Sequence, residues 1–212
     1  MTHVVVIIGG GELSAEAVAS VPEGAFVIAA DSGLDHAVAA GIRPDALVGD
    51  LDSISAAGRM WAYAHELVID QQPTDKDLTD TELALATAAG RDGATHLLVL
   101  GGSGDRLDHT LGTLLALGHP RLAHFRQVRG YLGGTEVAVV HPGRKVSLDL
   151  DPGATFSVLA LHGPASGVSV RGARWTLDDA DLGAGEARGV SNEAEEQTMV
   201  TCTTGVVTVV VP

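Results

Sequence analysis

Apolar and polar residues follow two different periods along the first 120 residues of the chain. Short, almost entirely apolar runs are typical of buried strands, and they occur at 4–8, 26–30, 46–48, 67–69 and 96–100. Between them, apolar residues at helical spacing predict helices at about 14–20, 34–40, 55–65, 78–89 and 107–117. This alternation of strand and helix predicts a parallel sheet with helices on both faces.

The pattern changes after about residue 121. Several later apolar segments alternate strictly, and turn sequences such as Asp151-Pro152-Gly153 separate them. They predict strands at 135–140, 146–150, 155–161, 167–170, 197–203 and 206–211, with no long helix among them. We therefore place a boundary near residues 121–134 and predict an α/β fold. A doubly wound, mostly parallel sheet domain at 1–125 is followed by a β-sandwich domain at 126–212.

Composition and charge narrow the possible partners. No apolar run approaches the roughly 18–20 residues of a membrane span, and we recognise no signal peptide. The single Cys202 excludes an internal disulfide, so we expect a cytoplasmic protein. The 27 acidic residues outnumber 13 basic ones, and the net charge of −14 argues against nucleic acids and membrane surfaces as partners. If the substrate carries phosphate, a divalent cation is needed to offset these carboxylates.

Acidic residues gather where the predicted strands end. Four of the five strands are followed by carboxylates or by the glycine-rich loop 101–104. Because the carboxyl ends of parallel strands lie at one edge of a sheet, we expect these groups to converge there, where such sheets bind their ligands. The acidic residues concerned are Asp31, Asp50, Asp52, Asp75, Asp77 and Asp80.

Each of these aspartates also has a purely structural interpretation as a turn or helix-capping residue. Thr79 and Glu82, for example, have the spacing of a capping box. Asp50 and Asp52 are harder to explain in this way. In an extended chain they point to the same side while Leu51 packs behind them, and two adjacent like charges favour a bound cation. Mg²⁺ prefers such oxygen ligands.

The glycine-rich loop precedes a predicted helix and so offers backbone N–H groups to an anion. Gly102 and Gly104 are the glycines of interest, although a tight strand-to-helix turn explains them equally well. Arg106 is suited to pair with a phosphate, and Asp108 and His109 offer a proton acceptor. The neighbouring Asp105 is a candidate N-cap of that helix.

Taken together, these segments resemble the thiamine pyrophosphokinase family. The matching stretches follow the family's order along nearly the whole chain. They are Ala30-Asp31-Ser32-Gly33, Gly41-Ile42-Arg43-Pro44-Asp45, Gly49-Asp50-Leu51-Asp52-Ser53, Lys76-Asp77-Leu78-Thr79-Asp80, Arg106-Leu107-Asp108-His109 and Ser191-Asn192-Glu193. The resemblance implies an α/β domain followed by a β-sandwich. It also implies a homodimer that transfers a diphosphate group from ATP to the hydroxyl of thiamine with Mg²⁺, giving thiamine diphosphate and AMP.

The resemblance also implies roles for individual residues. Mg²⁺ is expected on Asp50, Asp52 and Asp77, with Asp31 or Asp75 in addition. The phosphates are expected near Gly102, Gly104 and Arg106. Asp108 is the candidate for orienting or accepting the hydroxyl proton, with Asp77 as the alternative, and His109 and Asp31 are expected to contact substrate. In the second domain, a turn at Ser191-Asn192-Glu193 is expected to help shape the thiamine pocket, and the ring of Trp175 is expected to pack on thiamine, although the turn and the tryptophan each also fit a structural role.

Two other functions remain open at this point. A diphosphokinase for another alcohol, such as a hydroxymethylpterin, requires the same acidic edge and differs only in its acceptor pocket. A nucleotide-binding sensor without turnover is the alternative outside enzymes, and the retention of Asp50, Asp52, Asp77, Asp80 and Asp108 argues against it.

Overall fold

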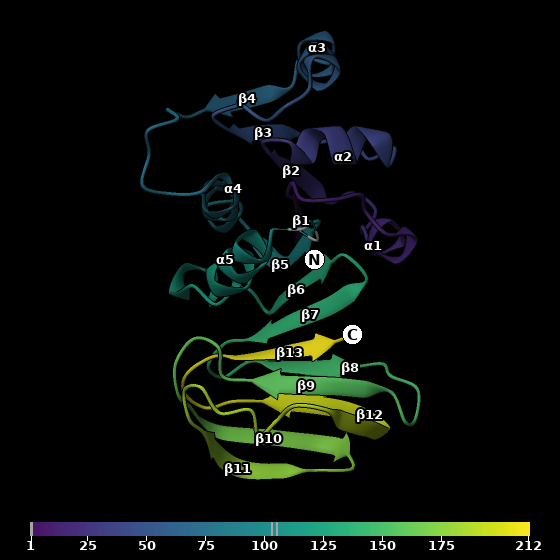
Figure 1. Ribbon diagram of the computed structural model, residues 1–212, viewed down its shortest axis with the longest axis vertical. Coiled ribbons are helices and arrows are strands. Elements are labelled where there is room, and N and C mark those ends of the chain that lie inside the picture. The colour runs from purple at the N-terminus through teal and green to yellow at the C-terminus, as the bar shows by residue number, and fades with distance from the viewer. Residues whose placement is uncertain (1, 103, 105) are drawn as a thin grey trace. The chain divides into compact units, whose positions relative to one another are not determined.

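The computed structural model describes residues 2–102, 104 and 106–212, and its chain divides into two compact units (Figure 1). Unit 1 contains the residues up to Ala116 together with Gly130–Gly134, and unit 2 contains Leu117–Arg129 and Thr135–Pro212. Each unit has its own hydrophobic core. Among the described residues, no helix is long and apolar enough to cross a membrane.

Unit 1 is built on a parallel sheet with the strand order β5-β1-β2-β3-β4. Its strands are β1 (Thr2–Ile7), β2 (Phe26–Ala30), β3 (Ala46–Gly49), β4 (Val68–Gln71) and β5 (Ala94–Leu100). The short apolar runs form the central strands because helices cover both of their faces, so that most side chains of β1, β2 and β3 are buried, whereas the edge strand β4 is largely exposed.

The helices of unit 1 are α1 (Ala15–Ala19), α2 (Gly33–Ala39), α3 (Ala56–Ala64), α4 (Asp80–Ala89) and α5 (Leu107–Leu117, of which Leu117 falls in unit 2). In β1, β2 and β3, odd-numbered residues such as Ile7 and Leu47 pack with residues of α1, α2 and α3. Even-numbered residues of these strands, such as Ile28, are buried on the other face, where α4 lies (Figure 1). The prediction of a doubly wound sheet is therefore confirmed.

Unit 2 is an antiparallel β-sandwich, also as predicted. Its strands are β7 (Thr135–Val140), β8 (Lys145–Leu148), β9 (Thr155–Leu159), β10 (Ala165–Ala173), β11 (Leu177–Leu182), β12 (Asn192–Thr201) and β13 (Val207–Val211), preceded by a short 3₁₀ helix at Pro120–Leu122. The start of β12 pairs with β9, whereas its far half pairs with β8 and β10. Inward side chains from all seven strands, including Phe156, Val200 and Val209, form one core.

Two strands and one turn differ from the sequence-based predictions. Strands β6 (Gln127–Leu132) and β11 were not predicted, and β11 has the acidic sequence LDDADL with mostly exposed side chains. The turn predicted at Ser191-Asn192-Glu193 is wrong for its last two residues, which begin β12. Only Ser191, with φ = 59°, has the backbone of a turn. The acidic stretch before Gln197 concealed this longer strand, because three consecutive polar residues, Glu195, Glu196 and Gln197, are exposed and interrupt the alternation.

Candidate functional site

Three carboxylates converge at the carboxyl edge of the parallel sheet in unit 1. Asp31 directly follows β2, and Asp50 and Asp52 follow β3. Each offers one oxygen, and these oxygens all lie within 4.8 Å of one another. The predicted convergence therefore holds for these three residues. Such a set of closely spaced hard oxygen donors suits Mg²⁺.

The loop after β3 brings Asp50 and Asp52 together by a different geometry from the predicted one. Leu51 has φ = 66°, so the chain turns there and is not extended. The N–H of Asp52 donates a hydrogen bond of 3.2 Å to Oδ1 of Asp50. Leu51 is buried against the core below α2 and α3, as expected. The tight turn, rather than strand alternation, directs both carboxylates to one place.

Gly49 and helix α4 bring a fourth carboxylate, that of Asp80, to the same place. Gly49 has φ = 141°, and a Cβ there would lie 2.9 Å from Oδ1 of Asp80 and 3.2 Å from Cβ of Asp31. Only glycine therefore allows this close approach. The Oδ1 of Asp80 also accepts a 3.3 Å hydrogen bond from the N–H of Asp50. The sequence alone did not assign Asp80 to the cation site, although its position in the Lys76–Asp80 motif is a signal.

A lysine lies among these acids. The Nζ of Lys76 is 2.7 Å from Oδ2 of Asp50 and 3.0 Å from Oδ1 of Asp80, and its side chain is 14% exposed. Burial alone would lower the pKa of the Lys76 ammonium, but its hydrogen bonds to the two carboxylates outweigh burial and raise it. The hydrogen bond from Lys76 in turn lowers the pKa of Asp50. Both side chains are thus charged at neutral pH.

Asp31 is the least compensated of the acids. It is 7% exposed, and its Oδ1 is buried without a hydrogen-bond partner among the residues that the structure describes. Burial raises the pKa of Asp31, and the negative charges of Asp80 and Asp50 raise it further. A buried carboxylate oxygen without a donor is costly, and a divalent cation would relieve that cost. The residues present therefore fit a magnesium ion.

The structure does not bring every predicted ligand into this cluster. Asp75 and Asp77 lie on the connection between β4 and α4 with exposed side chains, outside the group of converging oxygens. Arg106 and Asp108 pair with each other through two hydrogen bonds of 2.9 and 2.6 Å, and both are about two-thirds exposed. This pairing lowers the pKa of Asp108, so its carboxylate stays ionised and is a weak proton acceptor in this geometry.

A cavity of about 670 Å³ adjoins the cluster within unit 1. Its lining includes Asp31, Lys76 and Asp80 from the cluster and Arg106, Asp108 and His109 from the start of α5. Gly102 lines it as predicted, and Gly9 and Gly10 line it from the loop after β1. A Cβ on Gly104 would lie 2.7 Å from the carbonyl oxygen of Gly10, so the two glycine loops pack closely. The proposed N-cap Asp105 lies outside the described residues.

Unit 2 contains a second cavity, of about 460 Å³. Trp175, Val190 and Asn192 are among the residues that line it. Trp175 and Val190 are about half exposed, whereas Asn192 is buried. The Oδ1 of Asn192 accepts the Trp175 N–H at 3.1 Å, and its Nδ2 donates to the Trp175 carbonyl at 2.7 Å. The guanidinium of Arg174 lies 4.7 Å from the ring centroid of Trp175. Ser191 is exposed and is not part of this lining, but its N–H donates to Ser157 Oγ.

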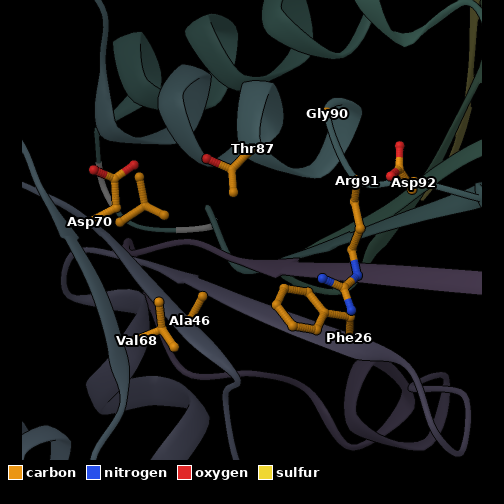
Figure 2. Close-up of a pocket in the computed structure, with 9 residues that line it drawn as sticks. Phe26, Ala46, Val68, Asp70, Thr87, Gly90, Arg91 and Asp92 are labelled. Atoms are coloured by element: carbon orange, nitrogen blue, oxygen red, sulfur yellow. The ribbon is translucent and has the colours of Figure 1, made fainter.

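A third hollow, of about 520 Å³, lies at the opposite edge of the sheet in unit 1 (Figure 2). Phe26, Ala46 and Val68, the first residues of β2, β3 and β4, line it together with the end of α4. The guanidinium of Arg91 covers the ring of Phe26 at 3.3 Å from its centroid. None of the residues that the sequence selected lies there, so the carboxyl edge remains the candidate catalytic region.

The fold and the site define a class of protein. In this class a doubly wound α/β unit has carboxylates suited to a cation at the carboxyl edge of its sheet, and it is joined to a β-sandwich. Residues 20–128 match the family described as "Thiamin pyrophosphokinase, catalytic domain", and residues 145–207 match "Thiamin pyrophosphokinase, vitamin B1 binding domain". The first match alone spans just over half of the chain. The chain therefore belongs to the thiamin pyrophosphokinase family.

Individual relatives agree with this assignment. "Thiamine pyrophosphokinase 1" of rice is 23% identical over 172 residues, which cover 74% of this chain and 61% of the rice protein. This chain thus spans about three-fifths of that relative's length. The fold is similar to thiamine pyrophosphokinase of Bacillus subtilis, with a TM-score of 0.81, 21% identity and coverage of 99% and 98% of the two chains. A family protein of Enterococcus faecalis has a TM-score of 0.79 and 25% identity, with coverage of 100% and 98%.

Proposed function

We propose that this protein is a thiamine pyrophosphokinase, which transfers a diphosphate group from ATP to the hydroxyl of thiamine and releases AMP. The observation that carries the proposal is the convergence of Asp31, Asp50 and Asp52 oxygens beside a glycine-lined cavity. The family matches to both parts of the chain supply the reaction class.

We propose that Asp31, Asp50 and Asp52 hold Mg²⁺, with Asp80 close by. When bound, the ion draws negative charge from the phosphates and fixes their orientation. The backbone amides near Gly102 and Gly104 and the guanidinium of Arg106 would bind phosphate oxygens. Asp75 and Asp77 remain proposed ligands that would have to approach from the exposed loop. Positioning and charge stabilisation are the main requirements of such a transfer, so no covalent enzyme intermediate is needed.

We propose one of two carboxylates, Asp108 or Asp77, as the proton acceptor. Asp108 lines the cavity beside His109, but it must leave Arg106 to accept a proton from the hydroxyl. A phosphate that pairs with Arg106 would release it, because the guanidinium prefers bidentate anionic partners. Asp77 is the alternative, since its exposed side chain has no such constraint.

We propose the cavity of unit 2 as part of the thiamine pocket. The exposed ring of Trp175 provides a flat apolar surface for a heteroaromatic ring. Asn192 fixes the backbone of Trp175 through both of its side-chain groups, so we propose that it orients the ring. Ser191 is proposed as a polar contact next to this cavity.

We also propose a homodimer in the cytoplasm. Leu107, Leu111 and Leu115 form an exposed apolar stripe on α5, which is the type of surface that a contact with a second copy would bury. Sedimentation equilibrium of the purified chain tests the dimer. Cys202 is a free, buried thiol, as is usual in a reducing compartment.

An assay of AMP release tests the proposed reaction. With ATP, Mg²⁺ and thiamine, the wild type should release AMP and form thiamine diphosphate. Asp52→Ala should reduce kcat by about 100-fold or more without loss of folding, because it removes a charged group that holds the ion over the phosphates. Asp178→Ala, which removes an exposed acid from β11, should behave like the wild type.

Two results would reject this function. AMP release with a hydroxymethylpterin and none with thiamine would establish a different acceptor. Tight ATP binding with no AMP release for any alcohol would indicate a sensor. Wild-type turnover by Asp52→Ala would exclude Asp52 from the proposed magnesium site.

A further inference from the structure

Lys76 already provides a positive charge to the acidic cluster. Its ammonium contacts Oδ2 of Asp50 at 2.7 Å, while Oδ1 of the same carboxylate accepts the N–H of Asp52 at 3.2 Å. The Asp50 side chain is only 8% exposed, so water screens this contact poorly. Both oxygens of Asp50 are thus engaged by groups of this chain.

A divalent cation on Asp50 would lie within a few ångströms of that ammonium. Two positive groups on one poorly solvated carboxylate repel each other strongly, because the interaction grows as distance and effective dielectric constant fall. The cluster cannot keep both contacts at full strength. Either the ion stays away from Asp50, or Lys76 moves.

We propose that Lys76 is the resident cation of this cluster, and that a divalent ion displaces its ammonium from Asp50 into the adjoining cavity. This inference rests on the proposed magnesium site. It assigns Lys76 a new role as a positioning residue that couples the binding of the divalent ion to the binding of a polyphosphate. The ion releases the ammonium, and a polyphosphate in the cavity then receives it.

The structure provides room and freedom for this movement. Lys76 lines the 670 Å³ cavity as well as the cluster, so its side chain has space on the cavity side. It lies on the connection between β4 and α4, which has neither helical nor strand structure at 72–79. A lysine side chain has four rotatable carbon–carbon bonds and can move its charge over several ångströms with little change in the backbone.

The displacement has a thermodynamic consequence. Free Mg²⁺ must compete with Lys76, whereas Mg²⁺ that arrives with a polyphosphate brings a new acceptor for the ammonium. The two ligands therefore favour each other's binding through Lys76. When neither ligand is present, the Lys76 ammonium offsets the charges of Asp50 and Asp80.

The lysine content of the chain allows a direct test, because Lys76 and Lys145 are its only lysines. Protein labelled with lysine carrying ¹³C at Cε and ¹⁵N at Nζ should give two lysine side-chain signals, which Lys145→Met assigns. Titration with Mg²⁺ alone should shift the Cε signal of Lys76 and remove the ammonium signal that its ion pairs protect from exchange. The Lys145 signals should not move, because Lys145 is an exposed residue of β8 in unit 2.

A second measurement uses the binding affinity. Lys76→Met should bind Mg²⁺ without nucleotide roughly tenfold more tightly than the wild type, since the competitor is gone. Lys145→Met should bind like the wild type. A lysine with only a structural role would destabilise the fold on removal but would not tighten metal binding.

The outcomes separate this inference from the proposed function. Metal binding by calorimetry with unmoved Lys76 signals would overturn the displacement and leave the magnesium site intact. Absence of Mg²⁺ binding, with and without ATP, would overturn both. If Lys76→Met fails to fold, the titration of the labelled wild-type protein still decides the question.

Discussion

At the scale of single residues, the burial of the Asp31 carboxylate has an electrostatic cost that a proton or a cation would relieve. Its Oδ1 is buried without a partner among the described residues, and burial raises its pKa above the ordinary 3.8. In the unfolded chain the same group ionises near its ordinary value. Ionised Asp31 therefore opposes folding at neutral pH, and this penalty fades as the pH falls through the folded-state pKa.

Asp31→Asn should therefore stabilise the protein in metal-free buffer at pH 7. We expect a gain of about 1 kcal/mol in the free energy of unfolding, the size of one relieved buried polar group. The gain should shrink as the pH falls through the raised pKa of Asp31, because the wild-type carboxyl then becomes protonated. Denaturant unfolding in the presence of a chelator measures it, with the exposed Asp92→Asn as the control. A variant less stable than the wild type at pH 7 would contradict this explanation.

The sequence predicted the partners of Asp31 better than it predicted their geometry. Strand ends located Asp31, Asp50 and Asp52 at one edge, because the chain order of parallel strands fixes which residues lie there. The turn at Leu51 could not be foreseen, since a positive φ at leucine is rare and is imposed by packing. Nor could the sequence show that Asp75 and Asp77 stay outside, because an irregular connection has no period to orient its side chains.

At the scale of elements, the first turn of α4 determines the position of Asp80. Thr79 caps this helix, with Oγ1 accepting the N–H of Glu82 at 3.2 Å while the Glu82 carboxylate accepts the N–H of Thr79 at 2.9 Å. This capping box was recognisable in the sequence. Its function became clear only in the structure, where the next residue, Asp80, reaches Lys76 and the N–H of Asp50.

Thr79→Ala should cost about 1 kcal/mol of stability, as is usual for a lost N-cap. It should also weaken Mg²⁺ binding, because Asp80 and its contacts lose their fixed position. Thr87→Ala in the last turn of α4 is the matched control, since Thr87 is exposed and its Oγ1 donates to the Leu83 carbonyl within the same helix. Thermal unfolding and calorimetric titration measure the two effects. Equal behaviour of the two variants would show that the cap does not support the site.

Strand β12 shows why the end of a strand can be mistaken for a turn. Asn192 and Glu193 are polar residues next to a left-handed serine, a combination that is typical of turns. In the structure Asn192 is buried, because its amide satisfies the backbone of Trp175 from the facing segment. This hydrogen bonding between residues distant in the chain cannot be inferred from the local sequence.

Asn192→Ala should therefore free the Trp175 segment. The Trp175 N–H and carbonyl would lose their partner, at a cost of about 2 kcal/mol. In a Trp61→Phe background Trp175 is the only tryptophan, so its fluorescence should move to longer wavelength and become more accessible to quenchers. Thiamine binding should weaken at the same time. Unchanged fluorescence would exclude a role for Asn192 in holding the ring.

At the scale of the whole molecule, the sequence predicted both halves because each has its own periodicity and its own core. The acidic strand β11 was missed because its residues show no apolar alternation. The net charge of −14 lies partly in these exposed acids and partly in the cluster. Asp31 and the side chain of Asp50 lie in a poorly solvated place, whereas Asp52 is exposed, so a cation acts on the first two far more strongly than on surface acids.

The core of unit 2 should give the molecule a dependence on pH that is separate from its carboxylates. His141 is 2% exposed and Nε2 of His162 lies 3.0 Å from the buried Thr208 hydroxyl. Burial lowers the pKa of both imidazoles below the ordinary 6.5. The unfolded chain therefore binds protons that the folded chain does not, and stability present above about pH 6.5 falls as the pH falls below it.

Thermal unfolding between about pH 7.5 and about pH 5.5, the range in which histidine titrates, should show this loss of stability in the wild type. The loss should be smaller in His141→Gln, because glutamine cannot be protonated. His65→Gln, an exposed change in unit 1, should keep the wild-type slope. A slope unaltered by His141→Gln would mean that this imidazole is protonated in the folded protein, and that its burial carries no penalty.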